Sequence, residues 1–174
     1  YILSKMEEGE SYEKTLKNAQ ELGYAEPDPS LDVNGTDAAH KIGILSSLAF
    51  NSSLPAHGFH IEGIEQITQS DFIYAREFGF VVKHLAVAKK TDNGIELRSH
   101  PTLLKYSSNL ASLKGVRNGI QIDTDLLGEF HIAGSGAGQE STASGIISDL
   151  ISLSRTKTSN SMNMPVFINP VKII

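Results

Sequence analysis

The sequence predicts an α+β fold in which a mainly antiparallel or mixed sheet is covered on one face by helices. Apolar residues recur at helical spacing near both ends of the chain, up to residue 50 and again over residues 141–154. Between these ends lie two pairs of apolar, β-branched segments, residues 80–89 with 95–100 and residues 119–123 with 129–133. Strands joined by short turns run antiparallel, and helices grouped at the ends favour α+β over a parallel sheet.

Residues that typically begin and end helices bound the helical segments. Ser11 and Thr36 are suited to cap helices at their N-termini, and Gly9, Gly23 and Gly79 stand where helices end. The predicted helices cover residues 1–8, 11–22, 37–50, 70–78 and 141–154.

Two turns complete the order of elements. Asp92-Asn93-Gly94 is a turn signal between the first pair of strands. The glycine-rich residues 134–138 join the last strand to the last helix, and on spacing alone they indicate a tight turn, because a dinucleotide fingerprint comes early in a βαβ unit. We therefore expect one domain over residues 1–154, followed by a linker and a short terminal segment over residues 155–174.

The composition limits the class of protein. The 174 residues are enough for one domain with a core, and a net charge of −5 argues against nucleic acid or an anionic membrane as partner. No apolar run approaches the roughly 20 residues that span a bilayer, and there is no cysteine for disulfides or thiolate metal sites. A cytoplasmic location is expected. Because the chain starts at Tyr1 in apolar-periodic sequence, we expect it to be a piece of a larger protein.

The richest functional pattern is an acidic loop that leads into a helix. Its four carboxylates are Glu26, Asp28, Asp32 and Asp37, and Pro27 and Pro29 stiffen the segment that carries the first two. Asp37 and Lys41 are four residues apart on the predicted helix and share a face. A carboxylate and an amine fixed side by side can hold an amino-acid substrate and transfer a proton to it.

Plainer interpretations of the same residues stay open. A pair such as Asp37 and Lys41 is most often a surface ion pair worth about 0.3–0.5 kcal/mol. The loop is equally suited to an α-ammonium group and to a divalent cation, although it lacks the spacing of a calcium loop. None of the six histidines has a metal-ligand spacing, so we assign no metal site.

Long motifs in this region closely resemble those of homoserine dehydrogenases. They are Gly23-Tyr24-Ala25-Glu26-Pro27-Asp28-Pro29, Asp32-Val33-Asn34-Gly35 and Asp37-Ala38-Ala39-His40-Lys41. Weaker likenesses follow at Tyr1-Ile2-Leu3, Met6, Glu62-Gly63-Ile64, Gly136-Ala137-Gly138 and Thr142-Ala143. Asn118-Gly119-Ile120 is similar to a family Asn-Ala-Ile and departs from it at the glycine. The resemblance covers most of the substrate-binding and dimerisation domain.

The resemblance implies that the protein is an oxidoreductase. Such an enzyme interconverts L-aspartate 4-semialdehyde and L-homoserine with NAD or NADP, on the way to threonine and methionine. It implies that Lys41 donates the proton to the aldehyde oxygen. It further implies a substrate site and a cofactor-facing surface, the first formed by Glu26, Asp32, Asp37 and Tyr24 and the second by Gly23, Gly136 and Gly138.

The resemblance also sets what this chain lacks. The family's N-terminal Rossmann domain, which holds most of the cofactor and a second lysine of the site, is absent from the sequence, so the chain alone is expected to be inactive. A homodimer formed through the sheet is expected. The alternatives are a non-catalytic dimerisation or cation-binding module, and a dehydrogenase for a related hydroxy acid.

Overall fold

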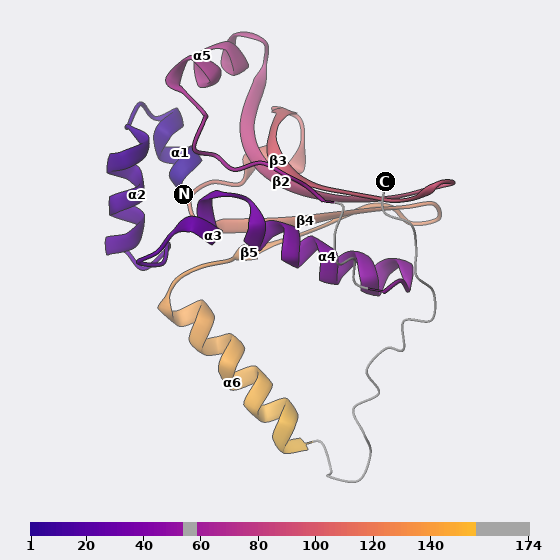
Figure 1. The fold of residues 1–174 in the computed structure, drawn as a ribbon. Helices are drawn as coiled ribbons and strands as arrows, with labels where there is room; N and C mark the ends of the chain where they lie inside the picture. Colours follow the sequence, from indigo (N-terminus) through magenta and orange to yellow (C-terminus); the bar gives the residue numbers. More distant parts are fainter. Residues whose placement is uncertain (54–58, 156–174) are drawn as a thin grey trace. The chain divides into compact units, whose positions relative to one another are not determined.

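The structure, a computed structural model, describes residues 1–53 and 59–155. Its described residues form two compact units, one of residues 1–28, 67–83 and 103–155 and the other of residues 29–53, 59–66 and 84–102. We call them the first and the second unit. The expected linker and short terminal segment fall almost wholly outside the described residues, and the last helix ends at Arg155. Figure 1 labels the helices and strands.

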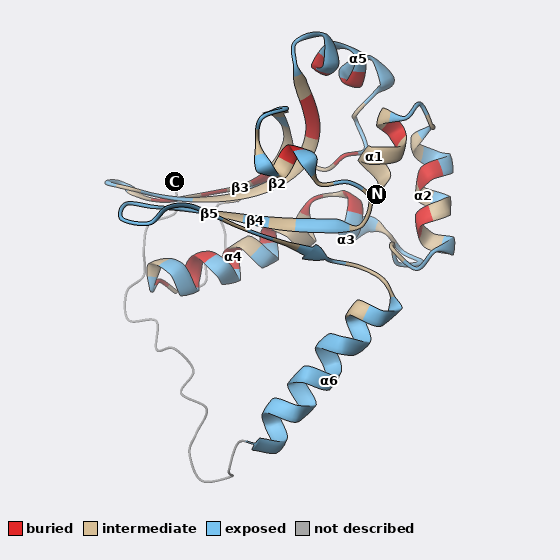
Figure 2. Cartoon of the chain, turned by 180° about the vertical axis from the view of Figure 1, so that it is seen from behind, coloured by how far each residue is buried: buried red, intermediate tan, exposed pale blue. Residues whose placement is uncertain are grey.

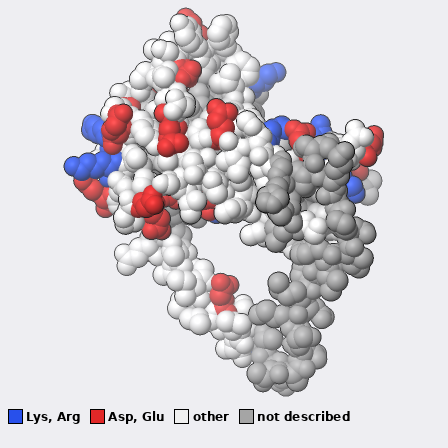
Figure 3. All heavy atoms as spheres, viewed as in Figure 1, with Lys and Arg blue, Asp and Glu red and all other residues white. Residues whose placement is uncertain are grey.

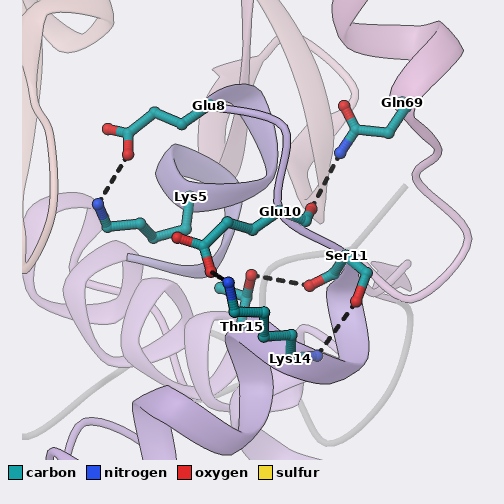
Figure 4. Close-up of polar contacts among 7 residues, drawn as sticks. All are labelled: Lys5, Glu8, Glu10, Ser11, Lys14, Thr15 and Gln69. Atoms are coloured by element: carbon teal, nitrogen blue, oxygen red, sulfur yellow. Dashed lines mark hydrogen bonds and ion pairs between the residues drawn. The ribbon is translucent and has the colours of Figure 1, made fainter.

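The first unit begins with two packed helices, α1 (Ile2–Glu7) and α2 (Tyr12–Glu21). Ser11 caps α2 as predicted, because its hydroxyl accepts a hydrogen bond from the Lys14 amide at 3.3 Å. The side chain of Gln69 donates to the carbonyl of Glu10 at 3.0 Å, as Figure 4 shows, and to the carbonyl of Met6 at 2.8 Å. The connection between the first two helices is thereby held by a residue far along the chain.

The core of the first unit lies between α1, the helix α5 (Gln69–Glu77) and the start of strand β2 (Phe80–Thr91). Met6, Phe72, Ala75 and Val82 are buried together there. The predicted helix over residues 70–78 exists, but it starts one residue earlier. Its cap is a reciprocal capping box between Thr68 and Asp71, in which each residue bonds the other's backbone.

The rest of the first unit is a hairpin and a helix. Strands β4 (Arg117–Thr124) and β5 (Gly128–Ser135) pair antiparallel, and the short helix η1 (Asn109–Ser112), which was not predicted, packs against β4. The last helix, α6 (Gln139–Arg155), contains no buried residue, as Figure 2 shows. Its predicted apolar face is exposed, at Ile146, Ile147, Leu150, Ile151 and Leu153.

The second unit contains the helices α3 (Ser30–Val33) and α4 (Thr36–Phe50) and most of a three-stranded sheet. The sheet order is β1-β3-β2, where β1 is His60–Ile61 and β3 is Gly94–Lys105. The two-residue turn between β2 and β3 makes them antiparallel, whereas β1 pairs parallel with β3. The mixed sheet confirms the predicted fold class. The short α3 and β1 were not predicted.

Strand β3 is longer than predicted because it continues through a proline. The expected end was His100, yet the strand runs to Lys105 with Pro101 inside it. Residues of β1 pair only with Arg98 and Ser99, so the proline follows the last position at which β1 lies beside β3. A proline lacks the amide that a ladder needs, and such a position tolerates it.

Helix α4 buries a different face from the one that its large apolar residues predict. The helical spacing of Ala38, Ile42, Leu45 and Ala49 predicts an amphipathic helix, but its buried residues are Ala39, Gly43, Ser46 and Ser47. Leu45 is exposed. Small side chains let the helix backbone approach its neighbours closely, so on α4 residue size decides the buried face more than hydrophobicity does.

Two observations concern partners. Among the described residues, no helix has both the length and the apolar character to cross a membrane. On the face drawn in Figure 3, lysine and arginine side chains are scattered among the carboxylates and do not gather into a basic surface.

Candidate active site

The helix that carries Asp37 and Lys41 begins at a fixed turn in the second unit. Gly35, not the predicted Thr36, is the N-cap of α4, and its φ of +86° lies in the left-handed region that favours glycine. The buried hydroxyl of Ser99 on β3 donates to the Gly35 carbonyl at 2.9 Å. The amide of Thr36 donates to the side-chain oxygen of Asn34 at 2.9 Å. An Asn side chain therefore supplies the capping acceptor that was expected from threonine.

The same turn lies directly against the segment after β1. The Ile64 amide donates to the Val33 carbonyl at 2.9 Å. A Cβ added to Gly63 would lie 2.5 Å from that carbonyl oxygen, and one added to Gly35 would lie 2.9 Å from the Glu62 carbonyl oxygen. Two glycines thus allow two backbone segments to touch, which fixes the start of α4.

Asp37 and Lys41 form the predicted pair on the first two turns of α4. The Lys41 ammonium donates to a carboxylate oxygen of Asp37 at 2.6 Å. The Lys41 side chain is 65% exposed and the Asp37 side chain 47%, so the ion pair by itself adds little stability. Its chemical value is that a proton donor stands at a defined place, accessible to a small molecule.

The carboxylates of the acidic loop belong to two different units. Glu26 and Asp28 are in the first unit, where the Gln20 side chain donates to the carbonyls of Glu26 at 3.1 Å and Pro27 at 3.0 Å. Asp32 is in the second unit, in the first turn of α3, which packs on α4. Within the second unit, Asp32 and the Asp37–Lys41 pair are thus on neighbouring helices. That Glu26 joins them at one substrate stays a prediction.

Gly23 and Tyr24 follow the end of α2. Gly23 has a φ of +70°, and the Tyr24 amide donates to the Ala19 carbonyl at 2.8 Å, so the chain turns back on the helix there. The Tyr24 ring lies edge-on to the Tyr1 ring, with 5.3 Å between the ring centres. Tyr24 therefore has a structural partner in the first unit beside its predicted role in substrate binding.

Two of the three predicted cofactor-facing glycines line one open cavity of about 530 Å³ in the first unit. Gly23 comes from the end of α2 and Gly138 from the start of α6, and the remaining lining residues are Glu21, Leu22, Gln139, Thr142, Ala143 and Ile146. The first turn of a helix presents unbonded amides that suit an anion such as a phosphate. That this cavity faces the cofactor stays a prediction.

Gly136 has a different environment. A Cβ at this position would lie 1.9 Å from the Asn118 side-chain nitrogen, and the Gly136 amide donates to the Val116 carbonyl at 3.0 Å. Its lack of a side chain is therefore required by packing against β4. At Gly119, where the sequence departs from the family pattern, a Cβ would lie 2.5 Å from a Leu113 methyl carbon, the end of a side chain that can shift.

Sequence reasoning missed a second cavity in the first unit, of about 520 Å³. Its charged lining residues are Glu7, Glu8, Arg76, Lys83 and Lys114. Burial lowers the pKa of the Lys83 ammonium, which donates to the Leu113 carbonyl. These five charged residues come from four separate segments, so no local pattern could have pointed to them. Among the residues that the structure describes, no group of three or more His, Asp and Glu side chains is arranged to hold a metal ion.

The chain has many similar proteins of known name. The family model for homoserine dehydrogenase matches residues 1–151. The homoserine dehydrogenase of Pseudomonas aeruginosa is 44% identical over 164 residues, which are 94% of this chain and 38% of that protein. The homoserine dehydrogenase of Helicobacter pylori is 46% identical over 160 residues, 91% of this chain and 38% of that protein.

Solved structures agree with these sequence matches. The crystal structure of a homoserine dehydrogenase from Thiobacillus denitrificans superposes with a TM-score of 0.88 at 38% identity, and the match covers 100% of this chain and 42% of that one. A hyperthermophilic archaeal homoserine dehydrogenase mutant in complex with NADPH gives a TM-score of 0.68 at 29% identity, over 92% of this chain and 46% of that one. This chain spans about 38% of the length of the curated relatives named above. The resemblance carried by the acidic loop is confirmed: the chain belongs to the homoserine dehydrogenase family.

Proposed function

We propose that a full-length protein containing this chain interconverts L-homoserine and L-aspartate 4-semialdehyde with NAD or NADP, as its family name implies. The observation that carries the proposal is the 2.6 Å contact between Lys41 and Asp37 on an anchored helix, in a chain of this family. A cytoplasmic location and a role in threonine and methionine biosynthesis go with the proposal.

The reaction needs a proton at the carbonyl oxygen of the semialdehyde. A bound nicotinamide cofactor supplies the hydride to the carbonyl carbon. Lys41 gives its ammonium proton to the oxygen, on which negative charge builds, and takes a proton from the homoserine hydroxyl in the reverse direction. Asp37 holds the Lys41 side chain in place by the hydrogen bond between them.

The remaining predicted residues bind and orient the reactants. In this proposal Glu26 and Asp37 hold the substrate through its α-ammonium group, Asp32 supports the cluster of carboxylates, and Tyr24 also takes part in substrate binding. Gly23 and Gly138, which line the open cavity, would lie against the cofactor, and the start of α6 would face its phosphate groups. Gly136 shapes this turn.

The test is homoserine oxidation by the full-length protein, followed by NAD(P)H absorbance, for wild type, Lys41→Ala and Lys14→Ala. Lys14 makes the same kind of i,i+4 ion pair with Glu10, at 3.1 Å, as Figure 4 shows, but it has no proposed role. We expect Lys41→Ala to lose about 10²–10⁴-fold in kcat, the usual value of a general acid, and Lys14→Ala to keep wild-type activity. Equal activity of the two variants would remove Lys41 from its role.

A second set of kinetic measurements tests which class of substrate the protein uses. Glu26→Gln should raise KM for homoserine and leave KM for the cofactor unchanged, and an unchanged KM for homoserine would exclude Glu26 from the substrate site. Faster turnover of a 3-hydroxy acid than of homoserine would favour the related dehydrogenase. A folded full-length protein that is stabilised by cations and inactive with either cofactor would instead support the non-catalytic module.

The hairpin of β4 and β5 supports the proposed homodimer. Ile120 lies opposite Ile132 and Ile122 opposite Phe130, so four partly exposed apolar residues share one face. Such a stripe favours contact with a second copy of the chain. Ile132→Glu should lower the mass measured by sedimentation, whereas Gln121→Glu, on the opposite face, should not; a dimer in both variants would exclude this face.

A further inference from the structure

The His84 side chain on β2 lies against the turn from which α4 begins, in the second unit. Its Nε2 atom is 2.9 Å from the Glu62 carbonyl oxygen, to which it donates a hydrogen bond. A Cβ on Gly35 would lie 3.1 Å from the same Nε2 atom and 3.3 Å from Cε1. The ring therefore fills the space beside Gly35 and at the same time holds the segment that stacks on Val33 and Gly35.

Ser99 fixes the other side of the same glycine. Its hydroxyl donates to the Gly35 carbonyl at 2.9 Å and is fully buried. Gly35 is thus held between β2 and β3, and its left-handed φ of +86° sets the direction in which α4 leaves the sheet. Because a helix moves as a stiff element, a change at Gly35 displaces Asp37 and Lys41, which lie on the first two turns.

We propose that His84 is a positioning residue for the Asp37–Lys41 pair, acting through the Gly35 turn in its neutral state and releasing that turn when the ring gains a proton. The link to catalysis rests on the function proposed above; the link from His84 to the turn does not. The neutral ring with its proton on Nε2 satisfies the Glu62 carbonyl, so no charge is needed for the contact.

The electrostatic surroundings agree with a neutral ring. Burial lowers the pKa of His84 below its ordinary value of 6.5, and the charge of His100 on β3 acts in the same direction. The hydrogen bond to the Glu62 carbonyl and the Glu62 carboxylate act the opposite way. Glu62 is itself paired with His60 at 3.6 Å, and α4 adds Asp37 and Lys41 to the charges near the turn.

The sign of the pH effect follows from these shifts. As pH falls below about 6.5, an unfolded or locally opened His84 binds a proton before the packed ring does. The packed state of the turn is therefore fully stable above this pH and is lost progressively as pH falls through the lowered pKa of the packed ring. Residues 36–41 are the part of α4 that this opening frees first.

The test is hydrogen–deuterium exchange of the full-length protein, read over residues 36–45 at pH 7.5 and 5.5 and corrected for the intrinsic exchange rate. The variants are His84→Gln, whose amide can donate to Glu62 but does not titrate, and His84→Leu, which cannot donate. His60→Gln is the matched control, because His60 is also a histidine beside Glu62, at 3.6 Å, but is not among the nearest neighbours of Gly35.

We expect acidification to speed exchange several-fold in wild type and His60→Gln and to leave His84→Gln unchanged, whereas His84→Leu exchanges fast at both pH values. The same acid response in wild type and His84→Gln, or its loss in His60→Gln, would overturn the proposal. If His84→Leu does not fold, the comparison of wild type with His84→Gln still tests whether His84 causes the response to acid.

Kinetics then connect the turn to the site. His84→Gln should keep wild-type kcat/KM for homoserine at pH 7.5 and lose less of it at pH 5.5, and His84→Leu should raise KM for homoserine several-fold without changing KM for the cofactor. Wild-type kinetics in both variants would exclude a positioning role. Exchange does not need turnover, so an inactive full-length protein would contradict the proposed function and still leave the His84 contact testable.

Discussion

The two units of this chain differ in the small and polar residues that they bury beside their large apolar ones. The first unit buries large apolar side chains, with Met6, Phe72 and Val82 packed among three elements. The second unit buries Ser46, Ser47 and Ser99 as completely as its apolar residues, together with Gly43. Large apolar side chains stabilise both units, with Ile95 and Leu97 among those buried in the second, whose small residues also let its backbone segments touch.

The Asp37–Lys41 pair of the candidate site lies in the unit with the small buried residues. Asp37 and Lys41 stand on α4, whose small buried face and glycine cap make its position depend on close backbone contacts. A substrate site needs such precision, because misplacement of a proton donor by about 1 Å costs catalysis heavily. The stability of the first unit and the precision of the second should therefore respond to different substitutions.

The largest effect is expected from Phe72→Ala in the first unit. Phe72 on α5 is 3% exposed and belongs to the apolar core, so its truncation should cost about 3–5 kcal/mol of unfolding free energy. The neighbouring Ile73 is 61% exposed, and Ile73→Ala should cost far less. Chemical denaturation followed by circular dichroism measures both; similar losses in the two variants would mean that this core does not carry the stability of the first unit.

A smaller loss is expected from Gly63→Ala in the second unit. The added Cβ would meet the Val33 carbonyl oxygen at 2.5 Å and the Asn34 Cα at 2.7 Å, and backbone atoms move at a cost of about 1–3 kcal/mol. The matched control is Gly145→Ala, in α6, where nothing lies within 4 Å. There, alanine should stabilise the helix by about 0.5–1 kcal/mol. Opposite signs in unfolding experiments are the expected result, and a neutral Gly63→Ala would argue against the close approach.

The smallest effect concerns the acid stability of the first unit. Hydrogen bonds from the backbone and the hydroxyl of Thr68 lower the pKa of Asp71 below 3.8. Because the folded state favours the charged carboxylate, its contribution is present above about pH 3.8 and is lost as pH falls through the lowered pKa. Wild type should therefore exceed Asp71→Asn in stability at neutral pH, with the difference shrinking as pH falls below 3.8. A difference independent of pH would mean that the capping box does not need the charge.

Local signals in the sequence predict some caps and turns of the fold correctly and others wrongly. Ser11 was correctly identified as a cap, and the two hairpins were placed at the right turns because turn residues act over a few positions. Thr36 was the wrong cap, since Gly35 accepts the left-handed conformation that the close contacts of this turn require. The helices and strands were thus predictable, and their shortest members, α3, β1 and η1, were not.

The candidate site shows the same limit. The pair of Asp37 and Lys41 follows from the period of a helix and from the family motif, and the structure brings the two side chains together. The roles of Glu26, Asp32 and Tyr24 stay predictions. The cavity shared by Gly23 and Gly138 joins residues more than a hundred positions apart, and no spacing rule relates them.

By itself, the sequence determined the fold class, the family and the pair on α4, because each depends on periodicity or on a continuous motif. Only the tertiary structure decided which face of α4 is buried, that Gly63 and Gly35 must be glycines, and that His84 lies against the turn from which α4 begins. Those contacts join segments distant in the chain, and their geometry depends on how closely two backbones approach, a quantity that no local pattern of residues encodes.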